Sequence, residues 1–451
     1  LILYYNLHRD NLDERYATAD MICTESQDVL SRGWRDLPPL WHPVLSMKFG
    51  SSAPGRPAPF GIIHSCPGMD WRHTGLPTAE YLFWMSGVAA GGGSIWHSIT
   101  GFCDTISDKR LLKALTEVNH KIAKIEGDMD SASPRSDALL LWDGGKSAEG
   151  WADILMNNQL QFDLAAPYQV TRERLAGYPL VIVPEGFPLE NGRPKVLEEY
   201  VSKGGRLIFE GADGEQLAPV AGLLGISESI SASESLTACY WQFEPEGAPL
   251  RGEEFQETPL LPHRGRTAYC KPLPGTAILA TLVPPFAPLN SVGAPPERAS
   301  MLVEHTELPL CLYRQEGKGA ALTLTFMLGR LMGEFRLAEH SRLGRNLVRF
   351  MLGEKQTFDM KPVNGLEAVC YEKGRDILVH LLNGVGQRPL MDTIEYHGAK
   401  FSVRLPKGSR AEEVELKLSG EEPLWKQEGE RLTVEVPRLS YWDMVKITLA
   451  K

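Results

Sequence analysis

The sequence predicts an α/β protein that ends in an antiparallel β-sandwich. Short apolar runs within residues 1–133 each end in polar residues, which is typical of buried parallel strands followed by helices. The same alternation restarts at Asp137, and beyond Lys355 it gives way to short alternating strands separated by turn signals. A single hydrophobic core rarely grows beyond about 250 residues, so a chain of 451 residues is expected to hold about two to four domains.

The first part, residues 1–133, is predicted to contain four strands and a long helix. Ser107 can cap the helix, and apolar residues fall at helical spacing from there to Gly127. Residues 128–136 have the composition of a linker. The four strand-like runs are LILYYN (1–6), ADMICTE (19–25), PFGIIHS (59–65) and GGSIWHS (92–98).

The middle part, residues 137–355, is predicted to be an open sheet covered by helices. A helix that begins near Pro194 and stops at Gly204 separates two apolar strand runs, as in a βαβ unit. Residues 245–298 form a proline-rich excursion that is expected to be rich in loops. The predicted strands are ALLLWD (138–143), YPLVIVPEG (178–186), RLIFEG (206–211) and a strand-like stretch at 310–327, and a last helix covers Leu343 to Met351.

The last part, residues 356–451, alternates apolar and polar side chains as the strands of a small sandwich do. The predicted strands are EAVCYEK (367–373), DILVHLLN (376–383), KFSVRLP (400–406), EEVELKL (412–418), RLTVEVP (431–437) and MVKITLA (444–450).

Composition excludes several classes of partner. With 57 acidic and 47 basic side chains the net charge is -10, and no basic stripe is present that would follow a nucleic acid backbone. The longest apolar runs are far shorter than the roughly 20 residues that span a bilayer, so no membrane partner is expected. The seven cysteines lack zinc spacing, and no GxGxxG or P-loop spacing occurs. A cytoplasmic protein without metal or cofactor is therefore expected.

Several strings resemble a family of glycoside hydrolases, the β-galactosidases that carry a trimerisation domain. In the middle part these are LVIVPEG, VLEEYVSKGGRLIFEG and YRQEGKGAALTLTFMLGR, and in the last part ILVHLLN and VPRLSYWDMVKI. In the first part they are ADMICTESQ, HSCPGMDWRH and AAGGGSIWHSITGF. Their order and spacing cover nearly the whole chain.

The resemblance implies three domains, a carbohydrate substrate and a homotrimer. Residues 1–133 would be the C-terminal portion of a TIM (β/α)₈ barrel, 137–355 a flavodoxin-like domain similar to class I glutamine amidotransferases, and 356–451 the sandwich. Such a barrel has eight strands, and only four are predicted here. The chain also begins with Leu1, within a strand-like run. We therefore expect the first half of the barrel to lie outside this sequence.

The family resemblance also implies hydrolysis of a glycosidic bond by two carboxyl groups. The acid/base glutamate of family members lies in the earlier half of the barrel, so no residue here corresponds to it. Their nucleophilic glutamate is matched by His64, which is followed by Ser65, Cys66 and Pro67. A histidine at this position departs from the β-galactosidase mechanism.

Glu25 and Asp70 are the candidate catalytic carboxylates. Glu25 ends a predicted strand, where a side chain can point into the mouth of a barrel. It could equally be a structural residue that orients the loop carrying Trp34. Asp70 follows the next strand and could be the second carboxylate, or it could cap the turn that begins at Pro67.

Aromatic and imidazole side chains near these carboxylates suit a sugar, because rings pack on pyranose C–H surfaces and ring nitrogens bond hydroxyls. Each tryptophan could instead belong to the core, and the three histidines have no metal-ligand spacing. The candidate substrate-binding residues are Asn6, Trp34, His64, Trp71, Arg72, His73, Trp96 and His97.

Two other functions compete with a glycosidase. A non-catalytic carbohydrate-binding or structural protein is favoured by His64 and by the expected absence of half a barrel. An amidotransferase would need a cysteine on a tight elbow after a strand. The comparable strand end reads Glu210-Gly211-Ala212-Asp213, which argues against that activity.

Overall fold

The structure is a computed structural model that describes residues 4–7, 19–26, 39–52, 55, 57–102, 104–233, 236–284 and 305–450. Contacts between residues divide the chain into two units. The first unit comprises Leu1–Ser136, Met156–Asp163 and Thr357–Lys451, so the N-terminal segment and the C-terminal sandwich fall within one unit. The second unit comprises Asp137–Leu155 and Leu164–Gln356.

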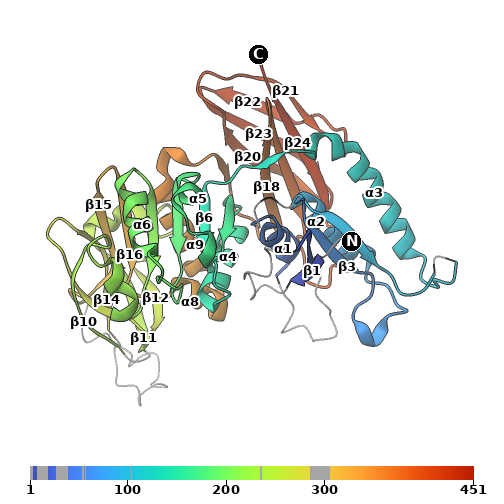
Figure 1. Cartoon of the computed structure of the whole chain (residues 1–451). Helices are drawn as coiled ribbons and strands as arrows, with labels where there is room; N and C mark the ends of the chain where they lie inside the picture. Colours follow the sequence, from blue (N-terminus) through green and yellow to red (C-terminus); the bar gives the residue numbers. More distant parts are fainter. Residues whose placement is uncertain are drawn as a thin grey trace. The chain divides into compact units, whose positions relative to one another are not determined.

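The N-terminal segment of the first unit is a parallel sheet of four strands in sequential order. The strands are β1 (Tyr4–Leu7), β2 (Met21–Glu25), β3 (Phe60–His64) and β4 (Ser94–Ser98). Between them lie α1 (His42–Ser52) and α2 (Thr78–Ala90), and α3 (Arg110–Met129) follows β4 (Figure 1). Sequential parallel strands joined by helices are the repeating pattern of a (β/α) barrel. Over the described residues the sheet is not closed.

The two faces of this sheet differ because side chains alternate along each strand. Ile22 and Ile63 are fully buried on the face covered by α1 and α2. A methyl group on Gly61 would collide with Val88 of α2, so that helix lies directly on the strand. Glu25 and His64 occupy alternate positions and therefore lie on the opposite face, where both side chains are partly exposed.

Residues 128–136 do not form the predicted linker. Helix α3 continues to Met129, and Ser133–Pro134 form a short strand, β5, which pairs with β18 (Leu366–Lys373) of the sandwich. Lys446 of the sandwich donates to Asp128 at 2.7 Å. The sequence shows only a polar, proline-containing stretch here, because the partner of β5 is more than two hundred residues away.

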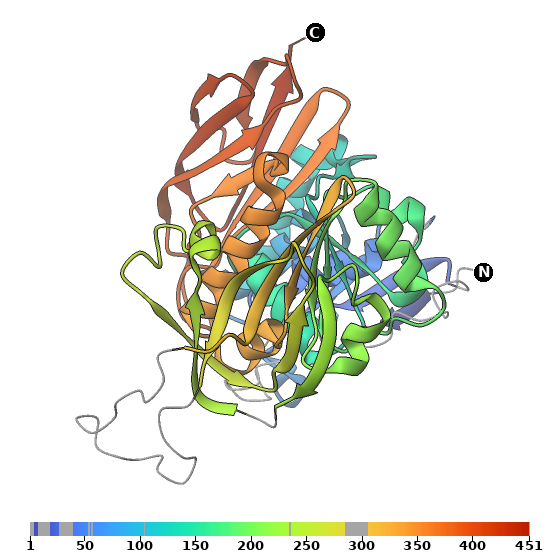
Figure 2. The same ribbon diagram turned by 90° about the vertical axis from the view of Figure 1, so that its left-hand side faces the viewer.

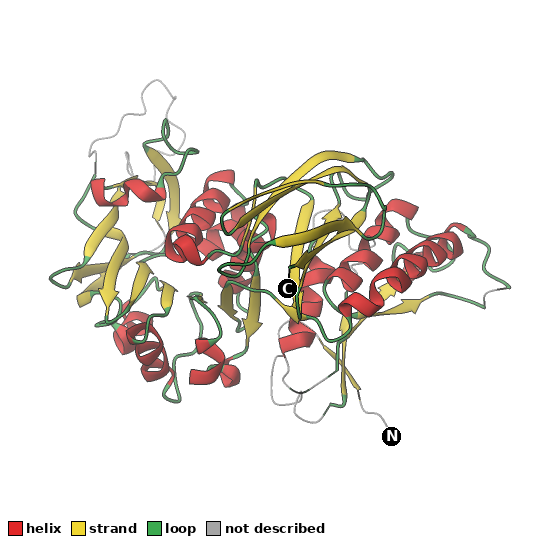
Figure 3. Cartoon of the chain, turned by 90° about the horizontal axis from the view of Figure 1, so that it is seen from above, coloured by secondary structure: helices red, strands yellow, loops and turns green. Residues whose placement is uncertain are grey.

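The sandwich consists of two antiparallel sheets with a shared apolar core (Figure 3). Six predicted strands are confirmed, and the short strands β17 and β22 are additional. One sheet has the order β17-β20-β23-β22 and the other β21-β24-β19-β18-β5. The remaining bounds are β17 (Phe358–Met360), β19 (Asp376–Asn383), β20 (Tyr396–Arg404), β21 (Ala411–Leu416), β22 (Leu424–Glu428), β23 (Arg431–Leu439) and β24 (Trp442–Leu449).

The second unit is built on a mixed sheet of nine strands in the order β12-β11-β14-β15-β16-β9-β8-β6-β7. Strands β6, β8, β9 and β16 are parallel, and the strands beyond β16 are antiparallel. The bounds are β6 (Ala138–Leu141), β7 (Phe162–Ala165), β8 (Leu180–Val183), β9 (Arg206–Glu210), β11 (Leu236–Phe243), β12 (Leu260–Gly265), β14 (Ala277–Val283), β15 (Pro309–Glu316) and β16 (Gly319–Leu324). A separate two-stranded sheet pairs β10 (Ile226–Ala232) with β13 (Ala268–Pro272).

Helices cover both faces of this sheet (Figure 2). Side chains of α5 and α6 pack with Leu139, Val181 and Leu207 in one apolar cluster. Gly344 of α9 lies against Ile154 of α4, so these two helices pack together. The helices are α4 (Lys146–Asn157), α5 (Arg172–Ala176), α6 (Arg193–Ser202), α7 (Gly214–Leu217), α8 (Leu328–Phe335) and α9 (Ala338–Leu352).

The proline-rich excursion at 245–298 is not mostly loop within its described part. It contains β12, β13 and β14, each of which pairs in a sheet. Prolines stand at or near strand ends in this region, for example Pro272 at the end of β13, where a missing N–H is tolerated. The prolines therefore obscured the strand pattern in the sequence, although the sheets accommodate them.

Candidate active site

Glu25 and His64 meet at the carboxyl ends of two neighbouring strands. The Nε2 atom of His64 lies 3.3 Å from Oε2 of Glu25. The Glu25 side chain is 36% exposed and the His64 side chain 16% exposed, so solvent reaches the pair. Because adjacent parallel strands end at the same edge, residues from the ends of β2 and β3 are brought together. The structure thus joins two of the residues that the sequence singled out.

The strand end that carries Glu25 is fixed by its neighbours. The Ser26 N–H donates to the carbonyl of Ile62 at 3.2 Å, which extends the pairing of β2 with β3 beyond Glu25. The Nε2 atom of His42, at the start of α1, lies 3.0 Å from the Glu25 carbonyl oxygen. Since a carbonyl can only accept, Nε2 carries the proton. The hydroxyls of Thr24 and Ser26 are 2.7 Å apart.

The Glu25 carboxylate affects the residue two positions before it. Burial and then the charge of Glu25 raise the pKa of the Cys23 thiol to about 12. Cys23 is fully buried and stays protonated at neutral pH, so it offers no thiolate nucleophile. Of the two, Glu25 is the group that can carry negative charge in this site.

Three aromatic rings form a cluster on the same face of the sheet. The ring of Trp96 lies 5.8 Å from that of Tyr4 and 5.5 Å from that of Phe60. Trp96 is 42% exposed and Tyr4 46% exposed. In the strand register Trp96 is level with Ile62 and hence with Glu25, whereas Tyr4 is level with Met21 at the start of β2. An exposed indole ring provides an apolar surface on which a pyranose can pack. Tyr4 and Phe60 were not predicted, because each reads as an ordinary apolar strand residue.

Asp70 lies in an exposed turn after β3. Residues Met69–Trp71 form one turn of 3₁₀ helix, and the Trp71 N–H donates to the carbonyl of Gly68. Trp71 is 55% exposed. Asp70, Arg72 and His73 are exposed as well. The turn therefore presents a carboxylate, a guanidinium, an imidazole and an indole ring to solvent.

The remaining predicted residues are placed differently. His97 lies at the alternate position to Trp96 and forms a hydrogen bond with Asn119 of α3, so it faces away from the Glu25 side of the sheet. Burial lowers the pKa of His97 below its usual range, and the bond to Asn119 raises it by less. Asn6 pairs in register with Cys23. Trp34 lies outside the described residues.

The groups around Glu25 suit carbohydrate chemistry. They combine a carboxylate and an imidazole at two strand ends with an exposed indole ring in the middle of β4. Within the described ranges no group of three or more His, Cys, Asp or Glu side chains is arranged to hold a metal ion. Sequence reasoning missed His42, because nothing in the run Pro38-Pro39-Leu40-Trp41-His42 signals a bond to a strand end seventeen residues earlier.

The second unit also has a carboxylate at a strand end, that of Glu210, but its oxygens are occupied by structural hydrogen bonds. Glu210 ends β9, is fully buried, and accepts hydrogen bonds from Ser147 Oγ and from the N–H groups of Glu185 and Gly329. Burial raises its pKa to about 7, against the opposing effect of these bonds. Glu210 therefore ties the ends of β9, β8 and α8 to α4.

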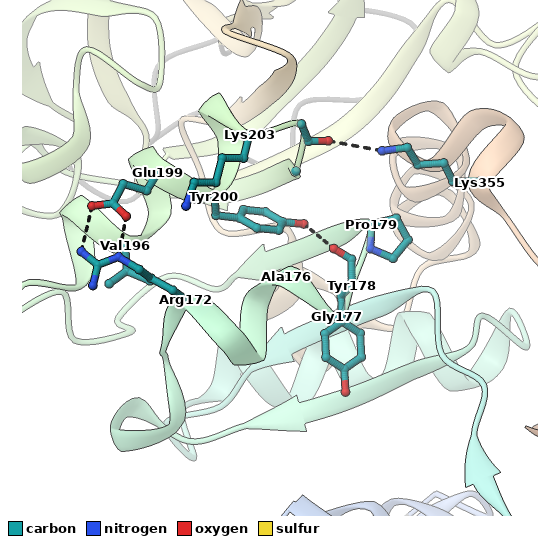
Figure 4. A pocket seen from close by; sticks show the side chains of 12 residues that line it. Arg172, Ala176, Gly177, Tyr178, Pro179, Val196, Glu199, Tyr200, Lys203 and Lys355 are labelled. Carbon is teal, nitrogen blue, oxygen red and sulfur yellow. Dashed lines mark hydrogen bonds and ion pairs between the residues drawn. The ribbon is translucent and has the colours of Figure 1, made fainter.

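A pocket of about 430 Å³ opens at the opposite, amino-terminal edge of this sheet (Figure 4). Arg172 holds Glu199 through two bonds of 2.5 and 2.8 Å, and Lys355 donates to the carbonyl of Gly204. The Tyr200 hydroxyl donates to the carbonyl of Tyr178. These polar groups already form hydrogen bonds and ion pairs with one another or cap helix ends, so no ligand is needed to explain their presence.

Comparisons with known proteins define the fold. No family model matches the sequence, and no curated protein matches it. Among solved structures, α-L-fucosidase isoenzyme 2 from Paenibacillus thiaminolyticus is similar at 15% identity and a TM-score of 0.76, over 99% of this chain and 67% of that one. A β-galactosidase from Bacillus circulans sp. alkalophilus is similar at 10% identity and 0.64, over 99% and 63%.

A catalytic mutant of Gan42B, a GH42 β-galactosidase from G. stearothermophilus, is similar at 12% identity and a TM-score of 0.63, over 97% of this chain and 60% of that one. The chain thus spans 60 to 67% of the length of these three matched structures. Among the residues that the structure describes, no helix has both the length and the apolar character needed to cross a membrane. Over nearly its whole length the chain shares the fold of these three structures.

Proposed function

We propose that this protein is a glycoside hydrolase in which Glu25 supplies the essential negative charge. The observation that carries the proposal is the Glu25–His64 pair at adjacent strand ends, on the face of the sheet that presents Trp96. An oxocarbenium-like transition state needs a nearby carboxylate, either to stabilise positive charge or to form a glycosyl ester. The glycosidase fold of the matched structures supports a carbohydrate as the substrate.

In this proposal each residue has a distinct role. Glu25 stabilises charge at the anomeric carbon, and His64 positions that carboxylate or moves a proton. Asp70 is the second carboxylate of the site, and Trp71 and Trp96 contact the sugar rings. The described N-terminal sheet has four strands and is not closed, which is half of an eight-stranded barrel. We expect the 451-residue chain alone to hydrolyse nitrophenyl glycosides poorly.

The test compares variants of the full-length protein. Glu25→Gln is expected to lower kcat by roughly 10³-fold or more while preserving the fold and sugar binding, since the amide is nearly isosteric but neutral. His64→Ala is expected to lose roughly 10²–10⁴-fold at most, the range for removal of a proton-transfer group. Asp70→Asn distinguishes the two possible roles of Asp70: a loss of kcat indicates the second carboxylate, and an unchanged kcat indicates a residue that only forms the turn. Near-normal turnover by Glu25→Gln, with circular dichroism unchanged, would refute the assignment.

A non-catalytic carbohydrate-binding protein is the second candidate. The exposed rings of Tyr4, Trp71 and Trp96 favour it, because they offer a binding surface whether or not a bond is cleaved. If the full-length protein binds oligosaccharides with these rings intact, loses affinity in Trp96→Ala, and hydrolyses none of them, this second function replaces the first.

A further inference from the structure

A loop of the C-terminal sandwich contacts the helix that precedes β4. Arg388 lies between β19 and β20, and its guanidinium donates to Oε1 of Glu80 through Nε at 3.0 Å and Nη2 at 2.8 Å. Two residues later the Leu390 N–H donates to the other carboxylate oxygen at 2.7 Å. The Arg388 side chain is 10% exposed and Glu80 is fully buried. The loop therefore grips the first turn of α2 with three bonds.

The same carboxylate holds a tryptophan one turn further along α2. The indole N–H of Trp84 donates to Glu80 Oε1 at 3.0 Å, as the i, i+4 spacing of a helix allows. The Arg388 guanidinium also lies over the Trp84 ring, 4.7 Å from its centroid. Trp84 is fully buried. Its ring is thus fixed through its edge by the fully buried Glu80 carboxylate and across its face by the Arg388 guanidinium, whose side chain is only 10% exposed.

Trp84 in turn contacts the histidine that holds the candidate catalytic strand. The rings of Trp84 and His42 meet edge to face, with centroids 6.2 Å apart and an interplanar angle of 75°. His42 is 5% exposed, and its Nε2 donates to the Glu25 carbonyl oxygen at 3.0 Å. A rotation of the imidazole would break that bond, and the Trp84 ring opposes such a rotation by occupying the space beside it.

We propose that Arg388 and His42 are positioning residues for Glu25, so that the C-terminal sandwich sets the orientation of the candidate catalytic carboxylate. The inference deepens the proposed function and rests on it. Contacts run without a gap from Arg388 through Glu80, Trp84 and His42 to the backbone of Glu25. Buried aromatic and ion-paired groups have few alternative rotamers, so each contact restrains the next.

The experiment uses the full-length protein and substitutions along this path. His42→Phe keeps a ring against Trp84 but removes the donor, and His42→Gln restores an N–H near the position of Nε2. Arg388→Gln removes the guanidinium, and Arg388→Lys keeps its charge. Arg404→Gln is the matched control, because it breaks another Arg–Glu pair of the same sandwich, with Glu430 at 3.1 Å.

Two readouts separate a positioning role from a general loss of stability. Hydrogen exchange at the Ser26 amide, which is bonded to Ile62 O, is expected to accelerate at least ~10-fold in His42→Phe and Arg388→Gln. Hydrolysis of a nitrophenyl glycoside is expected to lose roughly 10²-fold in kcat with KM nearly unchanged, the cost of a small misplacement of a reacting group. His42→Gln and Arg388→Lys should partly restore the wild-type exchange rate at Ser26 and the wild-type kcat. Arg404→Gln should change neither the exchange rate nor kcat.

The outcomes are distinct. A folded Arg388→Gln or His42→Phe protein that keeps the wild-type exchange rate at Ser26 overturns the proposal, and so does a loss of kcat of the same size in Arg404→Gln. If Arg388→Gln does not fold, the comparison of His42→Phe with His42→Gln tests the positioning role. A wild-type protein that hydrolyses no glycoside defeats the proposed function, while the exchange rates still show whether Arg388 and His42 hold the strand end.

Discussion

Buried carboxyl groups are accommodated in two different ways in the first unit. Glu80 is fully buried and accepts four hydrogen bonds, from Arg388 twice, Trp84 and Leu390. Glu367 of β18 is 4% exposed, and among the residues that the structure describes neither of its carboxylate oxygens has a hydrogen-bond partner. Burial alone raises the pKa of Glu367 to about 8. A protonated Glu367 is thus favoured in the folded protein at neutral pH, whereas in the unfolded chain the group is ionised.

We expect this difference to make stability fall as the pH rises. The folded pKa of about 8 lies above the ordinary pKa of a glutamate, so the folded state keeps a proton that the unfolded chain has released. The stability that this proton contributes is lost as the pH rises through 8. Glu367→Gln cannot ionise, so its free energy of unfolding should not show this dependence. Relative to wild type, that free energy should be higher at pH 9 than at pH 5 by on the order of 3 kcal/mol, since one pKa unit is worth about 1.4 kcal/mol. Urea unfolding at both pH values measures the gain.

Glu372→Gln, at an exposed position of the same strand, is the control and should show no such dependence on pH. An equal stability difference between wild type and Glu367→Gln at pH 5 and pH 9 would contradict the expectation.

Residues of the site could be predicted from the sequence when a local pattern, such as the end of an apolar run, fixes their position. Glu25 and His64 each end an apolar run, and the ends of adjacent parallel strands meet. His42 and Arg388 could not be predicted in the same way. Their contacts cross 17 and 308 positions of sequence, and no local pattern encodes such distances.

At the scale of helices and strands, uninterrupted apolar runs gave good bounds. The strand predicted at 376–383 is observed as Asp376–Asn383. β22 was missed because its residues Leu424–Glu428 are mostly exposed and polar, so they carry no alternation toward a core. β5 was missed because two residues are too few to show any periodicity.

Helices α4 and α8 of the second unit approach so closely that their backbones touch. A methyl group on Gly150 would overlap the carbonyl oxygen of Gly329, and one on Gly329 would overlap the Ser147 carbonyl oxygen. Neither obstacle is a flexible side chain. Both glycines are therefore required for packing and not for a positive φ angle.

Gly150→Ala is expected to destabilise the protein by about 2–4 kcal/mol, because the helices must separate to admit one methyl group. Thermal unfolding followed by circular dichroism measures the loss. Gly127→Ala is the matched control, since Gly127 is also helical and a methyl group there meets nothing within 4 Å. It should raise stability by roughly 0.5–1 kcal/mol, and a Gly150→Ala protein as stable as wild type would show that the helices can move apart freely.

At the scale of the whole molecule, the fold class was predicted more securely than the state of association. The mixed α/β character and the sandwich are observed, and the similarity to glycoside hydrolases is borne out by the matched structures. The number of copies in solution follows from surfaces, and neither hydrophobic periodicity nor the fold of one chain determines it.

We expect a homotrimer with closed cyclic symmetry, on the resemblance of the middle part to a trimerisation domain. Size-exclusion chromatography with light scattering should give three times the chain mass of 50.0 kDa. A mass of one chain at micromolar concentration would count against the trimer.

The pairing of β5 with β18 has a consequence for synthesis of the chain. Tyr371 and Glu372 pair with Pro134 and Ser133, so the whole second unit lies between two strands of one sheet. A ribosome therefore releases residues 137–356 before the sandwich that β5 joins has been translated. Since domains generally fold as units while the chain emerges, the inserted unit can complete its core first. The N-terminal segment gains its contacts with the sandwich, such as the pairing of β5 with β18, only after the last hundred or so residues have been made.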